Sequence, residues 1–299
     1  QGVDVAVIDG GFERLTAAQR AGELPQGTRV DLKNGSGLER VDVHGTACAE
    51  IIHDLAPGAN LHYILVENDL DFMNAVDYVS ERNIEIVSHS MGWYGLSAGD
   101  GRGRLNDAVD QTVANGTFWV NAAGNSAKNQ WVGEFRDTDA NGFHEFKPGV
   151  EALEIHPENL FGEKPLNLFL TWADWQWTVE DYDLILLKVE RGQLVPVQAS
   201  DGRNYLTPPR EHIVYQYVPG EVYKLQVYKT PNAVSMPIQI ASMYHDLGDR
   251  QPRASTIATP ADSRGAFAVG AVHHRDYENG PAESFSSRGP TTDGRIKPE

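Results

Sequence analysis

Strand-like and helix-like segments alternate over residues 1–125, and this alternation constrains the fold more than any other feature of the sequence. The strand candidates are apolar, β-branched runs at residues 3–8, 61–66, 84–87 and 117–120. The helix candidates lie between them at residues 45–55, 71–79 and 105–113, with Asp71 expected to cap the second. This order predicts an α/β fold in which a parallel sheet, joined by right-handed crossovers, has helices on both faces.

Three polar residues follow predicted strands. Asp9 comes directly after the first strand, Ser90 follows the third, and Asn125 lies just beyond the fourth. Because ligands of open parallel sheets bind at the carboxyl ends of the strands, we expect these residues to lie in one site.

The pattern changes after Asn125. Strand-like segments separated by turn-rich stretches follow one another with little helical periodicity, at residues 166–172, 183–189, 212–218, 222–228 and 237–243. They predict an antiparallel β-sandwich inserted as residues 126–255. The α/β character returns near Thr256, with a strand at 266–272, so the α/β domain is expected to comprise residues 1–125 and 256–299.

Composition excludes several classes of function. The 42 acidic residues outnumber the 25 basic ones, for a net charge of −17, and basic residues do not cluster, so no nucleic acid partner is expected. Apolar runs stay shorter than the roughly 18 residues of a membrane span, so no membrane partner is expected either. The single cysteine, Cys48, excludes an internal disulfide and a multi-cysteine metal cluster.

Four short motifs occur in a fixed order along the chain. They are Val5–Gly11, Val43–Ala49, Asn121–Asn125 and Ser284–Pro290. In residue type and order they resemble the Asp, His and oxyanion-hole Asn motifs of the subtilase family of serine endopeptidases, and the stretch that precedes its serine motif. The resemblance covers residues 1–125 and about 255–299, and the combination is far more specific than any one motif.

The resemblance implies an Asp-His-Ser triad. His44 would be the base that takes the serine proton, and Asp9 would hold its imidazole in the right tautomer. Asn125 would donate its side-chain amide to the oxyanion of the tetrahedral intermediate. Taken singly, each residue has a plainer reading: Asp9 and Asn125 as turn residues, His44 as a capping or core histidine.

The same resemblance implies where substrate binds. Ser90, Met91 and Gly92 would form one wall of the first specificity pocket, and the opposite wall would consist of Ala122, Ala123 and Gly124. An extended peptide would pair with these segments through its backbone, so the expected partner is a peptide or protein substrate.

The Gly-Thr-Ser motif that holds the family's nucleophile is absent from the 299 residues. The serine is therefore expected beyond residue 299, in the remainder of a longer chain, and this polypeptide alone is expected to be inactive. In subtilases the same segment forms a central helix, so without it an apolar face of the sheet would be exposed.

The resemblance also implies a secreted protein, and the inserted sandwich is loosely similar to prepeptidase-type modules of secreted bacterial peptidases. Two alternatives stay open. One is a serine-less pseudo-peptidase that binds peptides; the other makes the sandwich a carbohydrate- or protein-binding module, with the α/β part as scaffold. For the aromatic cluster Trp172, Trp175 and Trp177 we favour core packing over sugar stacking.

Two further features have a plain and a functional interpretation. Cys48 lies one helical turn after His44, which makes a Cys-His dyad conceivable; we favour a non-nucleophilic cysteine whose mercurial adducts would crowd His44. Asp137, Asp139 and Asn141 resemble the start of a calcium loop, but Pro148 occupies the position of the bidentate Glu, which favours a turn. No cofactor is required, and calcium is retained only as a candidate structural ion.

Overall fold

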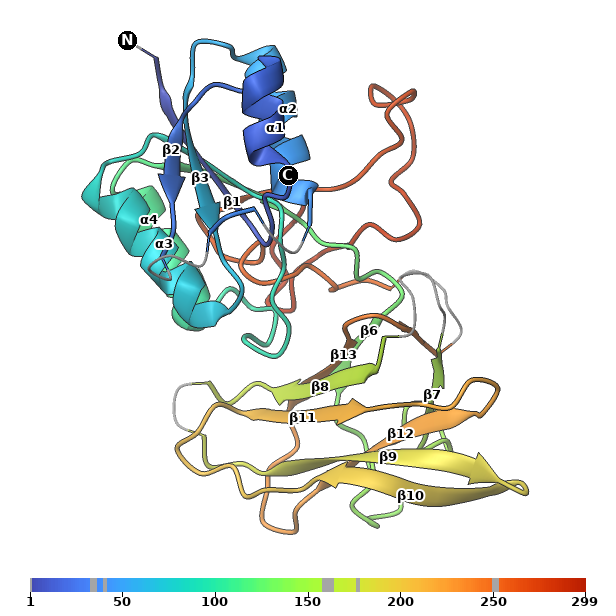
Figure 1. Cartoon of the computed structure of the whole chain (residues 1–299). Coiled ribbons are helices and arrows are strands. Elements are labelled where there is room, and N and C mark those ends of the chain that lie inside the picture. The colour runs from blue at the N-terminus through green and yellow to red at the C-terminus, as the bar shows by residue number, and fades with distance from the viewer. Residues whose placement is uncertain (1, 33–36, 40–41, 158–163, 176–177, 249–252) are drawn as a thin grey trace.

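The computed structural model describes residues 2–32, 37–39, 42–157, 164–175, 178–248 and 253–299, and it contains three sheets (Figure 1). The first is a parallel sheet with the order β15-β5-β4-β1-β3-β2. Its strands are β1 (Asp4–Asp9), β2 (Thr28–Val30), β3 (Asn60–Leu65), β4 (Ile86–His89), β5 (Phe118–Ala122) and β15 (Phe267–Val269). The predicted α/β class is confirmed.

Four helices cover this sheet on two sides (Figure 1). They are α1 (Leu15–Ala21), α2 (His44–Leu55), α3 (Asp69–Glu81) and α4 (Arg104–Ala114). Alternate residues of β1 explain the two layers, because successive side chains of a strand point to opposite faces. Val5 and Val7 pack in a cluster with α1 and α2, whereas Ala6 and Ile8 pack in a cluster with α3 and α4.

The start of α3 differs from the sequence expectation. Its N-cap is Asn68, whose side chain accepts a hydrogen bond from the backbone N–H of Asp71 at 2.9 Å. Asp71 is the third helical residue, and its carboxylate accepts from the N–H of Glu67 at 3.1 Å. Each side chain thus accepts a hydrogen bond from a backbone N–H at the start of the helix, as in a capping box. Because both residue types suit this task, the sequence alone did not distinguish Asn68 from Asp71 as the N-cap.

The other two sheets are antiparallel and lie together below the α/β part in Figure 1. One has the order β10-β9-β12-β7-β14 and the other β11-β8-β13-β6. Their strands are β6 (Gln130–Glu134), β7 (Leu153–His156), β8 (Leu166–Trp172), β9 (Tyr182–Glu190), β10 (Gln193–Ser200), β11 (Arg210–Tyr215), β12 (Tyr223–Lys229), β13 (Pro237–Ser242) and β14 (Asp246–Leu247). All of them fall within residues 126–255, although the domain boundaries themselves stay a prediction.

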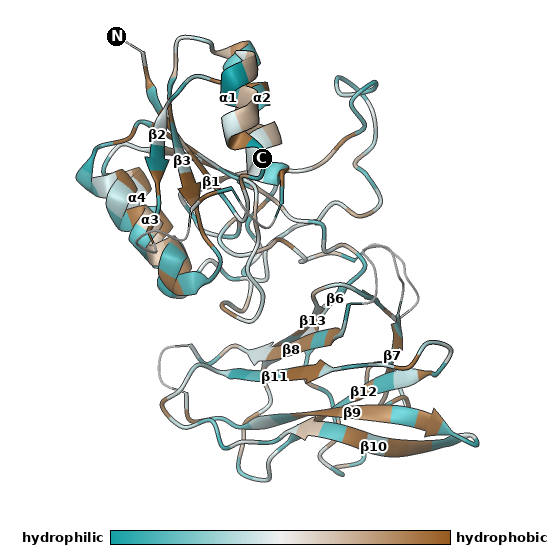
Figure 2. Cartoon of the chain, viewed as in Figure 1, coloured by the Kyte–Doolittle hydropathy of each residue, from teal (hydrophilic) through white to brown (hydrophobic). Residues whose placement is uncertain are grey.

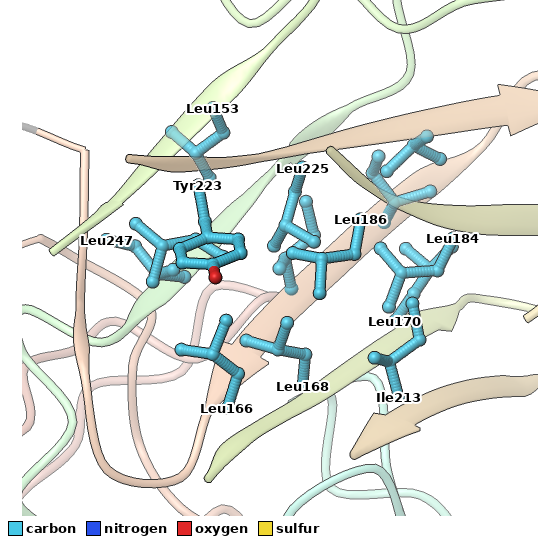
Figure 3. Close-up of a cluster of buried hydrophobic side chains, with 14 of the residues drawn as sticks. Leu153, Leu166, Leu168, Leu170, Leu184, Leu186, Ile213, Tyr223, Leu225 and Leu247 are labelled. Carbon is cyan, nitrogen blue, oxygen red and sulfur yellow. The ribbon is translucent and has the colours of Figure 1, made fainter. Parts of the chain in front are cut away.

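A leucine-rich core fills the space between these two sheets (Figure 3). Leu166, Leu168 and Leu170 alternate along β8 and face Leu184 and Leu186 of β9, all at 0% exposure. Figure 2 shows hydrophobic and hydrophilic residues on the strands and on the helices alike, as expected of elements that bury one side and expose the other. This core is the largest apolar cluster among the described residues.

The described residues leave one part of the parallel sheet without a covering layer. On β5 and β15, Phe118, Phe267 and Val269 are 52%, 41% and 45% exposed, and the two phenylalanine rings contact each other with centroids 5.7 Å apart. The opposite side of the same strands is buried, with Trp119 and Ala268 at 0% exposure. No helix among the described residues is both long enough and apolar enough to cross a membrane.

Candidate active site

Asp9 and His44 meet where β1 ends and α2 begins. His44 Nδ1 lies 2.8 Å from Asp9 Oδ2, and because a carboxylate only accepts, Nδ1 is the protonated nitrogen. The Asp9 side chain is almost fully buried, whereas that of His44 is half exposed. Gly45 permits the approach: a Cβ there would lie 2.6 Å from the carbonyl oxygen of Gly11 and 2.7 Å from the Asp9 Cβ.

This contact changes the proton affinity of His44. The hydrogen bond that His44 donates to Asp9, followed by the contact with the Cys48 thiol, raises the pKa of His44 to about 10. The same contacts stabilise the protonated ring relative to the neutral one. Any reaction that needs neutral His44 as a base becomes faster as the pH rises toward this value.

Cys48 lies on the same side of α2 as His44. Its Sγ is 3.9 Å from His44 Nδ1, the nitrogen that already faces Asp9. A nucleophile activated by this histidine needs the other nitrogen, Nε2, because Nδ1 is occupied by the carboxylate. The geometry thus supports the interpretation of Cys48 as a neighbour of His44 rather than as its nucleophile.

Asn125 is exposed in the turn after β5. Residues of the C-terminal part of the chain form hydrogen bonds with the backbone of this turn. The N–H of Ser287 donates to Gly124 O at 2.8 Å, and the Ser287 hydroxyl accepts from the N–H of Ser126 at 3.0 Å. Gly124 has a φ of 106°, and a Cβ there would lie 2.9 Å from the Cβ of Ala258. The motif around Ser287 therefore packs under the turn that presents Asn125.

Asn121 is a residue whose role the sequence did not reveal. It is fully buried between the two predicted pocket walls, and its side-chain Nδ2 donates to Met91 O at 3.2 Å and to Ala122 O at 2.9 Å. Its Oδ1 lies 2.7 Å from His89 Nδ1 and 3.2 Å from Trp119 Nε1, so both of these nitrogens donate. One amide thus ties the Ser90–Gly92 segment to the Ala122–Gly124 segment.

His89 supports that amide in its neutral form. Complete burial lowers the pKa of His89 to about 4, although the hydrogen bond to Asn121 opposes the shift. The only available signal in the sequence was a polar residue, Asn121, inside an otherwise apolar strand. The other wall residues are half-buried or buried: Ser90, Met91, Gly92, Ala122, Ala123 and Gly124.

The loop that follows Gly92 is held by a buried carboxylate far away in the sequence. Asp262 Oδ2 accepts from the Ser97 hydroxyl at 2.9 Å, and from the N–H of Gly101 and the side chain of Asn106 at 3.1 Å each. Burial raises the pKa of Asp262 to about 6 despite these donors. This carboxylate joins the loop to α4 and to the residues after the sandwich.

The same loop contacts the sandwich. The ring of Tyr94 stacks on Phe169 of β8 at 6.3 Å between centroids, and Phe169 stacks on His212 of β11 at 4.3 Å. The Thr171 hydroxyl donates to Ser97 O at 3.4 Å. The sandwich sheet that contains β8 thus lies against the loop that extends from one predicted pocket wall.

The candidate calcium loop and the tryptophan cluster are the remaining regions that the sequence analysis considered. Asp137 accepts from the N–H groups of Asn141 and Gly142 at 3.1 and 2.9 Å, and Asn141 Nδ2 donates to Asp139 Oδ2 at 3.1 Å, which is the hydrogen bonding of a turn. Calcium at this loop stays a prediction. Trp172 is fully buried in the sandwich core, whereas Trp177 lies outside the described residues.

Comparison with known proteins gives one family. Residues 1–142 match the profile of the subtilase family. Among solved structures, the CspB protease of Clostridium perfringens aligns over 100% of this chain and 75% of its own, at 15% identity and a TM-score of 0.59, which supports the fold. A lanthipeptide protease aligns over 42% of this chain and 40% of its own, at 20% identity and a TM-score of 0.33. With its motifs and its parallel sheet in place, the part of this chain that spans residues 1–142 is similar to the subtilase family of peptidases.

Proposed function

We propose that the protein is a subtilisin-like serine endopeptidase whose nucleophilic serine follows residue 299. The observation that carries this proposal is the 2.8 Å hydrogen bond between His44 Nδ1 and Asp9 at the carboxyl end of β1. No described residue forms a hydrogen bond with Nε2 of His44, which leaves that nitrogen available to a serine hydroxyl.

In the proposed reaction, neutral His44 takes the serine proton through Nε2 while the serine oxygen attacks the scissile carbonyl carbon. Asp9 holds the ring and stabilises the imidazolium. The exposed amide of Asn125 donates to the oxyanion. His44 then returns the proton to the leaving amine, and water releases the acyl group by the same steps in reverse order.

The uncovered apolar patch supports a covering segment that follows Glu299. Phe118, Phe267 and Val269 form the patch on β5 and β15. Glu299 lies beside it, because its N–H donates to Ala268 O at 3.1 Å and its carboxylate accepts from the N–H of Ala268 at 2.7 Å. A segment that begins here would reach the patch within a few residues.

The pocket walls support an extended peptide as substrate. Asn121 holds Met91 and Ala122 in a fixed relation, so that backbone groups of both walls would be available to pair with a peptide. Secretion also belongs to this proposal; it is tested by looking for the mature chain in the medium of the producing cells.

A fluorophosphonate probe tests the proposal. The protein, extended by its natural continuation beyond Glu299, is expected to be labelled on one serine in that continuation, located by mass spectrometry. His44→Ala should abolish labelling, whereas His53→Ala, at the other end of α2, should not. If the folded, extended protein stays unlabelled but binds extended peptides, it is a serine-less peptide-binding protein instead.

A further inference from the structure

The side chain of Tyr94 connects the sandwich to the turn that presents Asn125. Tyr94 comes shortly after Gly92, at the end of one predicted pocket wall. Its hydroxyl lies 3.0 Å from the hydroxyl of Ser126, the residue that directly follows Asn125. Burial raises the pKa of the Tyr94 hydroxyl above its usual value of 10.0, so the group stays protonated and able to donate. This hydrogen bond joins the loop after the wall to the predicted oxyanion turn.

The ring of Tyr94 is fixed by aromatic rings of the sandwich. It stacks on Phe169 at an interplanar angle of 13°, and Phe169 stacks on His212 at 5°. The His212 ring is oriented in turn, because its Nε2 donates to Asn167 Oδ1 at 2.7 Å. Gly95 permits the close contact, since a Cβ there would lie 2.8 Å from Phe169 Cδ1. Three nearly parallel rings thus connect the loop to β8 and β11, on the side of the sandwich that faces the α/β part (Figure 1).

Ser126 depends on this hydrogen bond for the position of its side chain. The residue is completely buried, and its N–H donates to the Ser287 hydroxyl at 3.0 Å, while its own hydroxyl contacts Tyr94. The exposed Asn125 side chain forms no hydrogen bond with the described part of the chain. The direction of its amide is therefore set by the backbone of the turn, which Ser126 fixes on one side.

A small change in this turn would matter for catalysis. An oxyanion donor acts only when it lies within hydrogen-bonding distance of the point where the charge develops. Misplacement of a catalytic group by about 1 Å can lower a rate about 100-fold. Without the Tyr94 hydroxyl, Ser126 would keep its backbone hydrogen bond but lose the one that fixes its side chain.

We propose that Tyr94 is a positioning residue for oxyanion stabilisation. Its ring is held by the sandwich, and its hydroxyl fixes Ser126 and, through Ser126, the amide of Asn125. The inserted sandwich thereby contributes to the geometry of the active site. The catalytic consequence rests on the proposed function, whereas the hydrogen bond that restrains the turn does not.

Tyr94→Phe tests the proposal, because it keeps the ring and removes only the hydroxyl. In the extended protein, kcat for a peptide substrate should fall about tenfold, equivalent to one buried hydrogen bond, with little change in KM. The Ki of a peptide aldehyde should rise by the same factor, because its adduct with the serine has the same oxyanion. Tyr78→Phe removes a hydroxyl that lies 2.9 Å from His62 Nδ1; this matched control should leave kcat and Ki unchanged.

A double variant shows whether Tyr94 acts through Asn125. In the Asn125→Leu background, Tyr94→Phe should change kcat less than about twofold, because two residues that act through one interaction are not additive. Phe169→Leu, which removes the stacked ring but keeps the Tyr94 hydroxyl, should lower kcat about threefold. Equal losses from Tyr94→Phe in both backgrounds, or equal kcat in Tyr94→Phe and Tyr78→Phe, would overturn the proposal. An unchanged kcat in Phe169→Leu would refute the contribution of the sandwich.

Hydrogen exchange tests the restraint on the turn without any measurement of activity. Amide exchange in residues 124–127 should become about tenfold faster in Tyr94→Phe, because the turn opens more easily, and should not change in Tyr78→Phe. Unchanged exchange in Tyr94→Phe would refute the restraint. An extended protein that lacks peptidase activity but shows the faster exchange would refute the proposed function and leave the restraint standing.

Discussion

The α/β part and the sandwich differ in where their buried polar side chains lie. Between the sandwich sheets the core consists mainly of leucine, isoleucine, valine and aromatic residues, although His144, Ser242 and His245 are also buried in that part. The α/β part buries Asp9, His89, Asn121 and Asp262, all at 2% exposure or less, at or beside the candidate site. Burying a polar group costs free energy unless it is hydrogen-bonded, so a stable fold alone does not call for them. Each of these side chains contacts the candidate site or the loop beside it.

The difference indicates that the two parts of the chain have different roles. The sandwich is stabilised by apolar burial and offers a surface, at Phe169 and Thr171, against which the loop after Gly92 rests. In the α/β part, some buried positions are occupied by polar rather than apolar side chains, and these hold the pocket walls and the groups that carry protons in defined positions. Mutations in the first region should therefore change stability more than activity, and mutations in the second the reverse.

The largest expected effect is a loss of activity without a loss of stability, caused by a substitution in the α/β part. Asp9→Asn keeps the shape of the side chain but favours the wrong tautomer of His44, so turnover of the extended protein should fall about 10,000-fold. Steady-state kinetics and circular dichroism measure the two quantities. Asp54→Asn, on the exposed side of α2, should leave turnover unchanged. Equal losses in both variants would refute a specific role for Asp9.

The opposite effect is expected in the sandwich. Leu168→Ala opens a cavity in the core of Figure 3 and should lower the free energy of unfolding by about 2 to 5 kcal/mol. Leu194→Ala, on an exposed position of β10, should change it by less than about 0.5 kcal/mol. Urea denaturation checks both. If Leu168→Ala lowers kcat in the folded protein at the same time, the two regions are not functionally separate.

Removal of the exposed amide tests the oxyanion role. Asn125→Leu should reduce kcat about 100- to 1,000-fold with little change in KM, because the amide is needed only when the oxyanion forms. Asn74→Leu, on the exposed side of α3, is the control. A rise in KM at constant kcat would instead assign Asn125 to substrate binding.

The buried carboxylate of the loop predicts a pH dependence of stability. The pKa of Asp262 is raised from 3.8 to about 6, so the folded state holds a proton that the unfolded state releases. Its contribution to the free energy of unfolding is therefore lost as the pH rises from about 4 to about 6, by up to about 3 kcal/mol. Asp262→Asn should remove this slope in urea titrations at several pH values. Asp77→Asn, exposed on α3, should retain it, and identical slopes in all three proteins would contradict the assignment.

The smallest expected effect is a rise in KM when the hydrogen bonds of Asn121 between the two predicted pocket walls are removed. Asn121→Leu removes the hydrogen bonds to Met91 and Ala122, and should raise KM for extended peptides about tenfold, equivalent to one or two buried hydrogen bonds. KM for a short ester substrate, which does not pair with the walls, should change less. A uniform loss for both substrates would indicate a merely structural role.

Local patterns in the sequence predicted a large part of the fold. The apolar run before Asp9 and the helical periodicity after His44 correspond to β1 and α2, and the predicted strand at 166–172 is β8. Weak patterns were missed. The helix α1 has seven residues and no side-chain cap, and β10 is an exposed edge strand that contains Pro196 and a register shift beside it.

What the sequence determined by itself was the period of each element, the order of the motifs and the residues at the carboxyl ends of the strands, because these depend on neighbours a few positions apart. The hydrogen bonds of Asn121, the attachment of Asp262 to Ser97 and the approach of Cys48 to the Asp9-facing nitrogen of His44 were decided only by the tertiary structure. They join atoms from separate elements or depend on which way a side chain points, and neither hydrophobic period nor residue type records that distance or direction.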